Sequence, residues 1–317
     1  MQNHYDVIVI GGGAAGLTAG IYLSRAKVNT LILNEGAIGG QMVLTHEIAN
    51  YPGIESISGY ELARNMKSQA QKFGCTIKSN LKITEMDLNS DTKKVVVNNK
   101  DVYTAYAVII ATGGKSRTIG VPGEEEFKGK GISYCATCDG DFFQDKEIIV
   151  VGGGNSALEE AVSLTKYASK VTIVHQFDHF QAFEHYVDEA KKNPKINFIM
   201  ESKIVEFIGD EKLTKVRIEH QRTHEITEMN IDGVFIFIGY VPNTEKLEGI
   251  VELNDWKEIV VDKNLATNIP GVFAAGDSIA KRYRQVTTAV ADGTIAALSA
   301  AEYVNNLKKE LVLVTAN

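Results

Sequence analysis

The chain contains one pattern twice. Residues 6–35, DVIVIGGGAAGLTAGIYLSRAKVNTLILNE, align without gaps to residues 147–176, EIIVVGGGNSALEEAVSLTKYASKVTIVHQ. Each copy reads as a β-branched strand, a glycine turn, an amphipathic helix and a second apolar strand, which is the opening βαβ unit of a Rossmann domain. The duplication therefore predicts an α/β fold with two Rossmann-like, three-layer domains.

The glycines of both copies have the spacing of a dinucleotide-binding turn. They allow a tight turn, a close approach of the backbone to a pyrophosphate, and close packing of helix on strand. The positions are Gly11, Gly13 and Gly16 in the first copy and Gly152, Gly154 and Ala157 in the second. Because each turn opens a helix, its free N–H groups and partial positive charge favour a phosphate.

Three further features suit a cofactor with a ribose and a polyol chain. Glu35 ends the first copy, where a carboxylate accepts hydrogen bonds from a ribose 2′-hydroxyl. Residues 107–114, AVIIATGG, predict a buried strand that ends in a glycine turn. Residues 271–285, GVFAAGDSIAKRYRQ, predict a short strand leading to Gly276 and Asp277, whose carboxylate can bond a ribityl chain.

Composition narrows the class of protein. The 317 residues, 44% of them hydrophobic, suffice for one large core or two medium ones. The net charge of −7 argues against nonspecific nucleic-acid binding. The start, MQNHYDVIVIGGG, is not expected to be a signal peptide, and no apolar run approaches the roughly 20 residues of a membrane span. We expect a soluble cytoplasmic protein.

Two of the three cysteines form the motif Cys135-Ala136-Thr137-Cys138. Three cysteines are too few for a secreted disulfide framework, and in a reducing compartment CxxC indicates redox work or metal binding. Zinc needs about four ligands, which no second CxxC or CxxH supplies, so we expect no metal. At the start of a helix the pair can close one disulfide, and the helix N-terminus stabilises a thiolate. Cys75 is expected to be a small core residue.

Several motifs stand in the order and spacing of one family: GGGAAG, GGQ (Gly39–Gln41), ATG (Ala111–Gly113), CATCDG (Cys135–Gly140), GGGNSA, GYVPNT (Gly239–Thr244) and AAGD followed by RQ. Over essentially its whole length the chain resembles the bacterial-type, low-molecular-weight thioredoxin reductases. The resemblance implies FAD in a discontinuous domain of residues 1–115 and 245–317. Between these parts it places a nicotinamide-domain-like module, residues 116–244, which carries the dithiol and swivels about segments near Gly114 and Asn243. It also implies a homodimer and thioredoxin as the partner.

The resemblance also assigns roles to single residues. Cys138 faces the flavin, Cys135 attacks the partner's disulfide, and Asp139 is the acid/base, although a plain helix-terminus carboxylate is the alternative for Asp139. The implied FAD contacts are Gly11, Gly13, Ala15, Gly16, Glu35, Gly40, Gln41, Asn50, Thr112, Gly113, Gly276, Asp277, Arg284, Gln285 and Val286.

The second copy departs from the family's NADPH clamp, His-Arg-Arg-x-x-x-Arg. Residues 175–181 read HQFDHFQ, so the histidine remains and all three arginines are absent. A charge-assisted bond contributes about 1.5–3 kcal/mol, so losing two weakens binding roughly a hundred- to ten-thousand-fold. The missing arginines weaken NADH binding less. Asp178 could accept hydrogen bonds from the NADH ribose, but it lies two residues after the expected position. Phe177, Phe180 and Phe183 either line an adenine pocket or form a packed helical stripe, and the spacing favours packing.

A subgroup of the family, the ferredoxin-dependent flavin thioredoxin reductases, also lacks the arginine clamp. Three cysteines cannot hold an additional Cys₄ cluster, so single electrons must come from a separate protein. An acidic ferredoxin needs a basic face, for which the candidates are Lys128, Lys130, Lys281, Arg282 and Arg284. The working hypothesis is an FAD thioredoxin reductase that accepts electrons from reduced ferredoxin. The alternatives are an NADH- or NADPH-dependent reductase, an oxygen-using dithiol oxidase and a non-catalytic redox-sensing flavoprotein.

Overall fold

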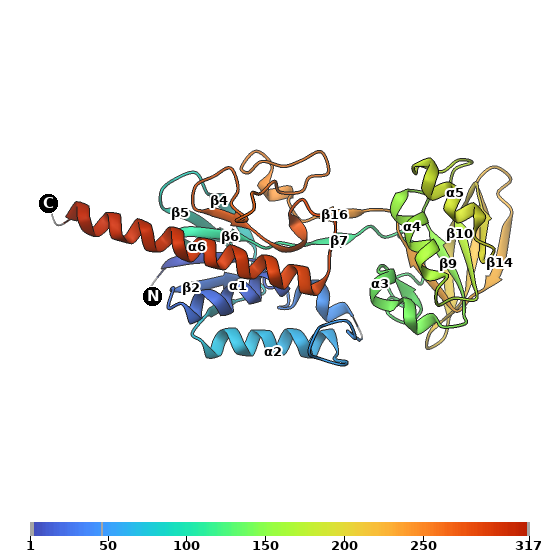
Figure 1. Cartoon of the computed structure of the whole chain (residues 1–317), viewed down its shortest axis with the longest axis horizontal. Coiled ribbons are helices and arrows are strands. Elements are labelled where there is room, and N and C mark those ends of the chain that lie inside the picture. Colours follow the sequence, from blue (N-terminus) through green and yellow to red (C-terminus); the bar gives the residue numbers. More distant parts are fainter. Residues whose placement is uncertain (1–2, 46, 316–317) are drawn as a thin grey trace. The chain divides into compact units, whose positions relative to one another are not determined.

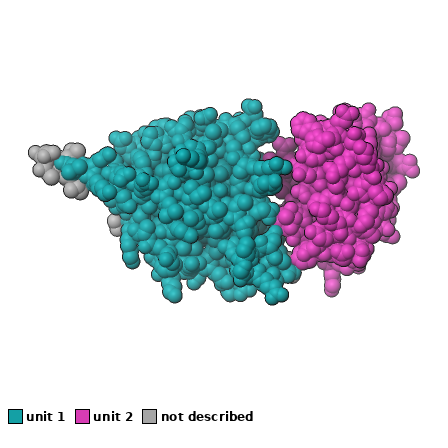
Figure 2. All heavy atoms as spheres, viewed as in Figure 1, with its two compact units in different colours: residues 1–115, 241–317 teal, residues 116–240 magenta. Residues whose placement is uncertain are grey.

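The computed structural model describes residues 3–45 and 47–315, which form two compact units. Unit 1 comprises Met1–Lys115 and Val241–Asn317 (teal in Figure 2). Unit 2, Ser116–Tyr240 (magenta), lies between these two segments in the sequence. Each unit is built on its own parallel sheet. The predicted fold class, α/β with a second Rossmann-like domain inserted in the first, is confirmed.

Unit 1 contains a seven-stranded sheet in the order β3-β2-β1-β6-β5-β4, with β17 also paired to β6. Strands β1, β2, β3, β6 and β17 are parallel, whereas β4 and β5 pair antiparallel. The bounds are β1 His4–Ile10, β2 Thr30–Leu33, β3 Thr76–Lys78, β4 Ile83–Asp87, β5 Lys93–Val97, β6 Asp101–Ile110 and β17 Val272–Ala274. The central strands are buried on both faces, which explains their continuous apolar runs.

The helices of unit 1 pack beside this sheet. They are α1 Ala14–Arg25, α2 Gly59–Lys72 and α6 Val286–Thr315, with the 3₁₀ turns η1 Gly40–Leu44, η3 Glu245–Leu247 and η4 Gly276–Ser278. Helix α1 lies between α2 and α6 (Figure 1). The sequence predicts an amphipathic α1, and this is wrong: ten of its 12 residues are buried, because neighbours cover nearly every side.

Unit 2 contains a parallel sheet in the order β11-β10-β9-β15-β8 and a smaller antiparallel sheet, β12-β13-β14. The strand bounds are β8 Ile132–Ser133, β9 Glu147–Val151, β10 Lys170–Val174, β11 Ile196–Ile199, β12 Ser202–Gly209, β13 Leu213–His220, β14 Ile226–Asn230 and β15 Gly233–Ile236. The helices are α3 Ala136–Asp139, η2 Gly140–Phe143, α4 Asn155–Leu164 and α5 Glu184–Lys192. The segments that join the units, β7 Gly114–Ser116 and β16 Tyr240–Pro242, pair with each other.

The sequence duplication is a structural duplication. Strand β1, helix α1 and strand β2 correspond to β9, α4 and β10, and in both units the two strands pair in parallel. Each glycine turn lies between the first strand and the helix. Cys75 is buried at 5% exposure, as predicted for a core residue. Within the described residues, no helix is long and apolar enough to cross a membrane.

Candidate redox dithiol and cofactor site

The dithiol lies at the start of a single helical turn. Cys135 and Cys138 are joined by a disulfide with a Cα–Cα distance of 5.3 Å. Cys135 is the N-cap of α3, and its sulfur accepts a hydrogen bond from the Cys138 N–H at 3.2 Å. An N–H that points at a sulfur stabilises a thiolate there once the disulfide is reduced. The predicted CxxC at a helix start is therefore confirmed, although the α-helix is only four residues long.

Asp139, the last residue of α3, is bound by a serine that sequence reasoning missed. The Ser133 hydroxyl lies 2.6 Å from Asp139 Oδ2, and it also accepts the Cys135 N–H at 3.1 Å. Burial raises the pKa of Asp139, and the Ser133 bond lowers it. Asp139, which directly follows Cys138 in the sequence, thus holds its proton more tightly than an ordinary aspartate. Nothing in the sequence distinguishes Ser133 from any other serine at the end of a strand.

The segment before the dithiol is anchored by a buried acid, Glu124, which is 3% exposed. Its carboxylate accepts the Tyr134 hydroxyl at 2.7 Å and the backbone N–H groups of Ile119 and Gly120 at 3.0 and 2.6 Å. Burial and this carboxylate raise the pKa of Tyr134, so its hydroxyl stays protonated and keeps donating. Glu124 thereby fixes the residue that precedes Cys135.

The first glycine turn needs glycine for steric reasons. Gly11 has a φ of +109°, and a Cβ there would lie 2.1 Å from the Ala111 carbonyl oxygen. A Cβ at Gly16 would lie 1.9 Å from the Gly11 oxygen, so helix α1 packs directly on the turn. Gly13 is the N-cap of α1 and provides no capping side chain, which leaves the first N–H groups of the helix available to a ligand.

Segments far apart in the sequence meet at the carboxyl ends of β1, β6 and β17. The Ala275 N–H bonds the Ile110 oxygen at 2.8 Å, directly after β17 and β6. A Cβ at Gly276 would meet the Cβ of Ala15 at 2.9 Å. Ligands of open α/β sheets bind at this edge of the strands. The three glycine-containing segments predicted from sequence therefore converge at one such edge.

Several other predicted cofactor residues lie around this edge. Asn50 donates to the Gln285 side chain at 3.4 Å, just before α6 begins at Val286. Glu35 uses one oxygen, Oε1, to accept the Ile83 N–H at 2.7 Å and the Lys246 ammonium at 2.5 Å. Gln41 lies exposed within η1. Sequence reasoning missed Lys246, because it lies more than 200 positions from its partner.

The second glycine turn has the same backbone as the first, but a different neighbour. Gly152 has a φ of +137°, and a Cβ at Gly153 would lie 2.4 Å from the His175 ring. His175 is 5% exposed, and its Nε2 has no hydrogen-bond partner within the described residues. Burial lowers the pKa of His175, which makes it a neutral residue at neutral pH. The histidine of the clamp motif is thus a packing residue of the turn.

The packed helical stripe predicted for the three phenylalanines is wrong. Helix α5 begins only at Glu184, and Phe177, Phe180 and Phe183 lie in the loop before it. Phe180 packs against Phe198 with ring centroids 5.7 Å apart, whereas Phe177 and Phe183 are 39% and 65% exposed. The backbone of this loop is bonded to the glycine turn, because the Gln181 N–H donates to the Gly153 oxygen at 2.8 Å.

Comparisons with known proteins identify the family. A family model described as pyridine nucleotide-disulphide oxidoreductase matches residues 5–293. A thioredoxin reductase from Peptoclostridium acidaminophilum is 46% identical over 96% of this chain and 98% of its own length. The crystal structure of thioredoxin reductase from Streptococcus pyogenes gives a TM-score of 0.93 at 41% identity, over 96% of this chain and 100% of that chain. The chain belongs to the low-molecular-weight thioredoxin reductase family. A further relative, from Clostridium pasteurianum, is named as a 34.2 kDa protein in the rubredoxin operon and is 46% identical over 96% of this chain and 98% of its own length.

Members of this family are FAD-dependent flavoproteins, and unit 1 fits that cofactor. The Thr112 hydroxyl is buried without a hydrogen-bond partner within the described residues, as expected for a group that bonds a ligand. A Cβ at Gly40 would lie 3.2 Å from the Gly13 Cα, so these two glycines keep side chains out of the space before α1. The first glycine turn therefore leaves space in which a pyrophosphate can bind.

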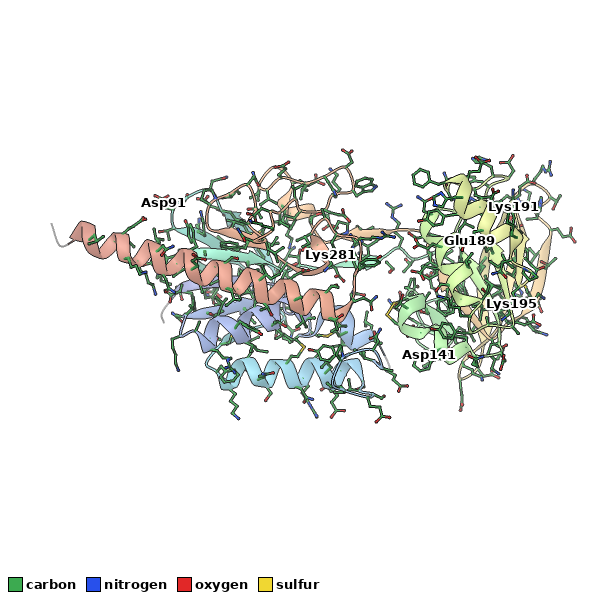
Figure 3. All side chains as sticks on the ribbon, in the orientation of Figure 1. Asp91, Asp141, Glu189, Lys191, Lys195 and Lys281 are labelled. Carbon is green, nitrogen blue, oxygen red and sulfur yellow. A yellow bond between two sulfur atoms is a disulfide. The ribbon has the colours of Figure 1, made fainter. Side chains whose placement is uncertain are left out.

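Asp277 lies in a network of partly buried charges. Its pKa is raised by burial and lowered by Lys281 and Arg284. The Lys281 ammonium, labelled in Figure 3, lies 2.6 Å from Asp292 Oδ2 and 3.7 Å from Asp277 Oδ1. Arg284 pairs with Glu258.

These ion pairs correct the predicted basic face. The Lys281 side chain is only 12% exposed and the Arg284 side chain 22%, so both serve mainly as internal counter-ions. Arg282 is exposed and lies over the Tyr283 ring at 5.2 Å, and Lys128 lies over the Tyr134 ring at 5.1 Å. The sequence could not show which of these cations are held in ion pairs and which are exposed, because consecutive loop residues point in different directions.

Proposed function

We propose that this protein is an FAD-dependent thioredoxin-disulfide reductase that accepts electrons from reduced ferredoxin and not from NADPH. The observation that carries the proposal is a contrast between two duplicated turns. The first keeps an open glycine turn with an available helix N-terminus, and the second has lost the cations that hold a 2′-phosphate. The dithiol with its stabilised sulfur supports the disulfide chemistry.

The predicted FAD contacts in residues 1–115 and 245–317 are retained as the proposed cofactor site, and residues 116–244 as the dithiol module. Their support is the convergence of the turn at Gly11, the segment at Thr112 and the loop at Gly276 at one sheet edge. FAD, when bound, accepts electrons singly or in pairs and supplies the pair that opens the Cys135–Cys138 disulfide.

The two cysteines then exchange with the thioredoxin disulfide. The Cys135 thiolate, stabilised by the Cys138 N–H, attacks one thioredoxin sulfur, which forms a mixed disulfide and releases the other as a thiolate. Asp139 gives its proton to the leaving thiolate. Cys138 loses its proton to Asp139 and attacks the Cys135 sulfur, which re-forms the internal disulfide and releases the second thioredoxin sulfur as a thiolate. This thiolate takes up a proton from solvent, which completes the dithiol thioredoxin. The raised pKa of Asp139 suits both proton transfers.

The charges at the positions of the family's NADPH clamp argue against NADPH binding. Residues 175–183 contain no lysine or arginine. The bond from His179 lowers the pKa of Asp178, so this exposed carboxylate is ionised at neutral pH. Arg222, the cation that acts on Asp178, is paired with Glu201 at 3.2 Å. A 2′-phosphate would meet repulsion here, without the attraction of about 3–6 kcal/mol that two arginines provide.

One relative supports a one-electron donor. The Clostridium pasteurianum protein, 46% identical to this chain, is named for its place in a rubredoxin operon, and rubredoxin is a small iron protein that transfers single electrons. Ferredoxins are also one-electron iron proteins, and they are typically acidic. The exposed cations Arg282 and Lys130 offer complementary charge to such a donor.

A homodimer is part of the proposal. Tyr22 on α1 and Ile295 and Leu298 on α6 are 42%, 41% and 56% exposed, and the two helices pack against each other. Exposed apolar side chains on adjoining helices suit an interface with a second copy. Light scattering of the purified protein tests this, and a mass near 34.6 kDa would contradict it.

An anaerobic turnover assay tests the donor. Purified holoprotein is mixed with oxidised thioredoxin and, in turn, reduced ferredoxin, NADPH and NADH, and the thioredoxin thiols are counted. We expect turnover with ferredoxin alone, and none when Cys138 is replaced by serine. Turnover with NADPH at a micromolar KM, without turnover by ferredoxin, would refute the donor assignment. Peroxide production that does not depend on thioredoxin would instead identify a dithiol oxidase.

A further inference from the structure

A single buried hydroxyl connects the acid to the dithiol. Ser133 is 5% exposed and ends strand β8, two residues before Cys135. Its oxygen lies 2.6 Å from Asp139 Oδ2, 3.1 Å from the Cys135 nitrogen and 3.3 Å from the Cys135 carbonyl oxygen. Ser133 therefore bonds both the Asp139 carboxyl group and the backbone of Cys135.

The chemistry of a hydroxyl gives these contacts two arrangements. A hydroxyl donates one proton and accepts through two lone pairs. When Asp139 is ionised, Ser133 donates to its carboxylate. When Asp139 is protonated, the carboxyl group donates to Ser133, and the serine proton turns to the Cys135 carbonyl oxygen. In both arrangements the Cys135 N–H still has its acceptor.

We propose that Ser133 is a positioning residue that holds Asp139 in both of its protonation states and fixes it to the backbone of Cys135. The inference rests on the proposed function for its role in turnover. Without the Ser133 hydroxyl, the Asp139 carboxyl group loses its link to the backbone of Cys135, and the Cys135 N–H loses its acceptor. Proton transfer then becomes slower, although the cysteines still form their disulfide.

Other charged groups near Asp139 act differently. Asp141 in η2, labelled in Figure 3, raises the pKa of Asp139 through charge repulsion. Tyr134 is turned to Glu124, which it bonds at 2.7 Å. Burial raises the pKa of Asp139 and Ser133 lowers it, so removal of the serine hydroxyl raises it further.

The test compares Ser133→Ala with Ser133→Thr, which keeps a hydroxyl. The control is Ser202→Ala, a buried serine in the same unit whose hydroxyl donates to the Met200 oxygen at 2.8 Å. The first readout is infrared titration of the Asp139 carboxyl, assigned by its absence in Asp139→Asn. The second is kcat and KM for thioredoxin.

We expect Ser133→Ala to lower kcat about tenfold at unchanged KM, because a hydrogen bond to an ionisable acid is lost. Its carboxyl band titrates at higher pH than in the wild type. Ser133→Thr restores both values, and Ser202→Ala changes neither.

An unchanged titration in Ser133→Ala, or an equal loss of kcat in the alanine and threonine variants, would overturn the proposal. If Ser133→Ala does not fold, a threonine variant with a shifted carboxyl titration has the same consequence. If the wild type fails to reduce thioredoxin, the infrared titration still reports on the Ser133–Asp139 bond. Failure of the proposed function and failure of this inference are therefore distinguishable.

Discussion

Restoring the arginine clamp is the sharpest test of why this protein would not use NADPH. The perturbation is the triple variant Gln176→Arg, Phe177→Arg and Gln181→Arg, which recreates the family pattern after His175. All three side chains are exposed, so the substitutions leave the core intact. The loop backbone is held by bonds that do not involve these side chains, among them the Phe183 N–H to the Asn155 side chain at 2.8 Å.

The magnitude follows from the bonds that the arginines can make. Each charge-assisted bond to a phosphate contributes about 1.5–3 kcal/mol. Two such bonds give about 3–6 kcal/mol, or a hundred- to ten-thousand-fold lower Kd for NADPH. Asp178 stays in place and repels the phosphate, so we expect a gain near the lower end of this range. NADH, which lacks the 2′-phosphate, should gain almost nothing.

Calorimetry with NADPH, NADH and 2′,5′-ADP measures these affinities in the wild type and the variant. The control replaces Gln144, Ser169 and Thr223, three exposed neutral residues of unit 2, with arginine, which adds the same charge elsewhere. We expect the gain only in the clamp variant and only for ligands with a 2′-phosphate. An unchanged NADPH affinity in the clamp variant would show that something other than the missing cations excludes this nucleotide. Micromolar NADPH binding by the wild type would refute the reasoning at its start.

Three further predictions concern the cofactor edge and the acid. Gly11→Ala should destabilise unit 1 by about 1–3 kcal/mol and release FAD, because its Cβ would meet the Ala111 oxygen at 2.1 Å at a φ of +109°. Thermal unfolding measures this loss of stability. The control is Gly36→Ala, because Gly36 has open space around it. Lys281→Met should raise the pKa of Asp277 and weaken FAD binding most above that pKa, where the Asp277 carboxylate then lacks its neighbouring ammonium. Fluorescence titration of FAD checks this, with the exposed Arg282→Met as control. Asp139→Asn should melt higher than the wild type at neutral and alkaline pH, and equally at acidic pH. The native state holds the Asp139 proton more tightly than the unfolded state, so wild-type stability falls as pH rises between the two pKa values; equal melting curves at all pH values would contradict this.

The sequence predicted the features that depend on short stretches of chain. A glycine turn between a strand and a helix needs only a few adjacent residues, so both turns and both βαβ units were readable. The same holds for Cys135 and Cys138, whose spacing places one thiol at the cap of the turn that contains the other. The errors arose where a spacing fits two structures, as with Phe177, Phe180 and Phe183, whose spacing of three suits a helix although they lie in a loop.

Tertiary structure decided the partners of the charged and polar groups. The sequence predicts that Lys281 is a surface cation, but α6 brings Asp292 to it, and the pair is mostly shielded from solvent. Glu35 meets Lys246 from the far part of the chain, and Asp139 meets Ser133 from a strand on the other side of the dithiol. Such partners depend on which segments the sheets bring together. The sequence alone does not show which distant residue a charged side chain will meet. By itself the sequence therefore determined the two turns and the redox motif, whereas only the fold decided which acids have a raised pKa and which cations remain exposed.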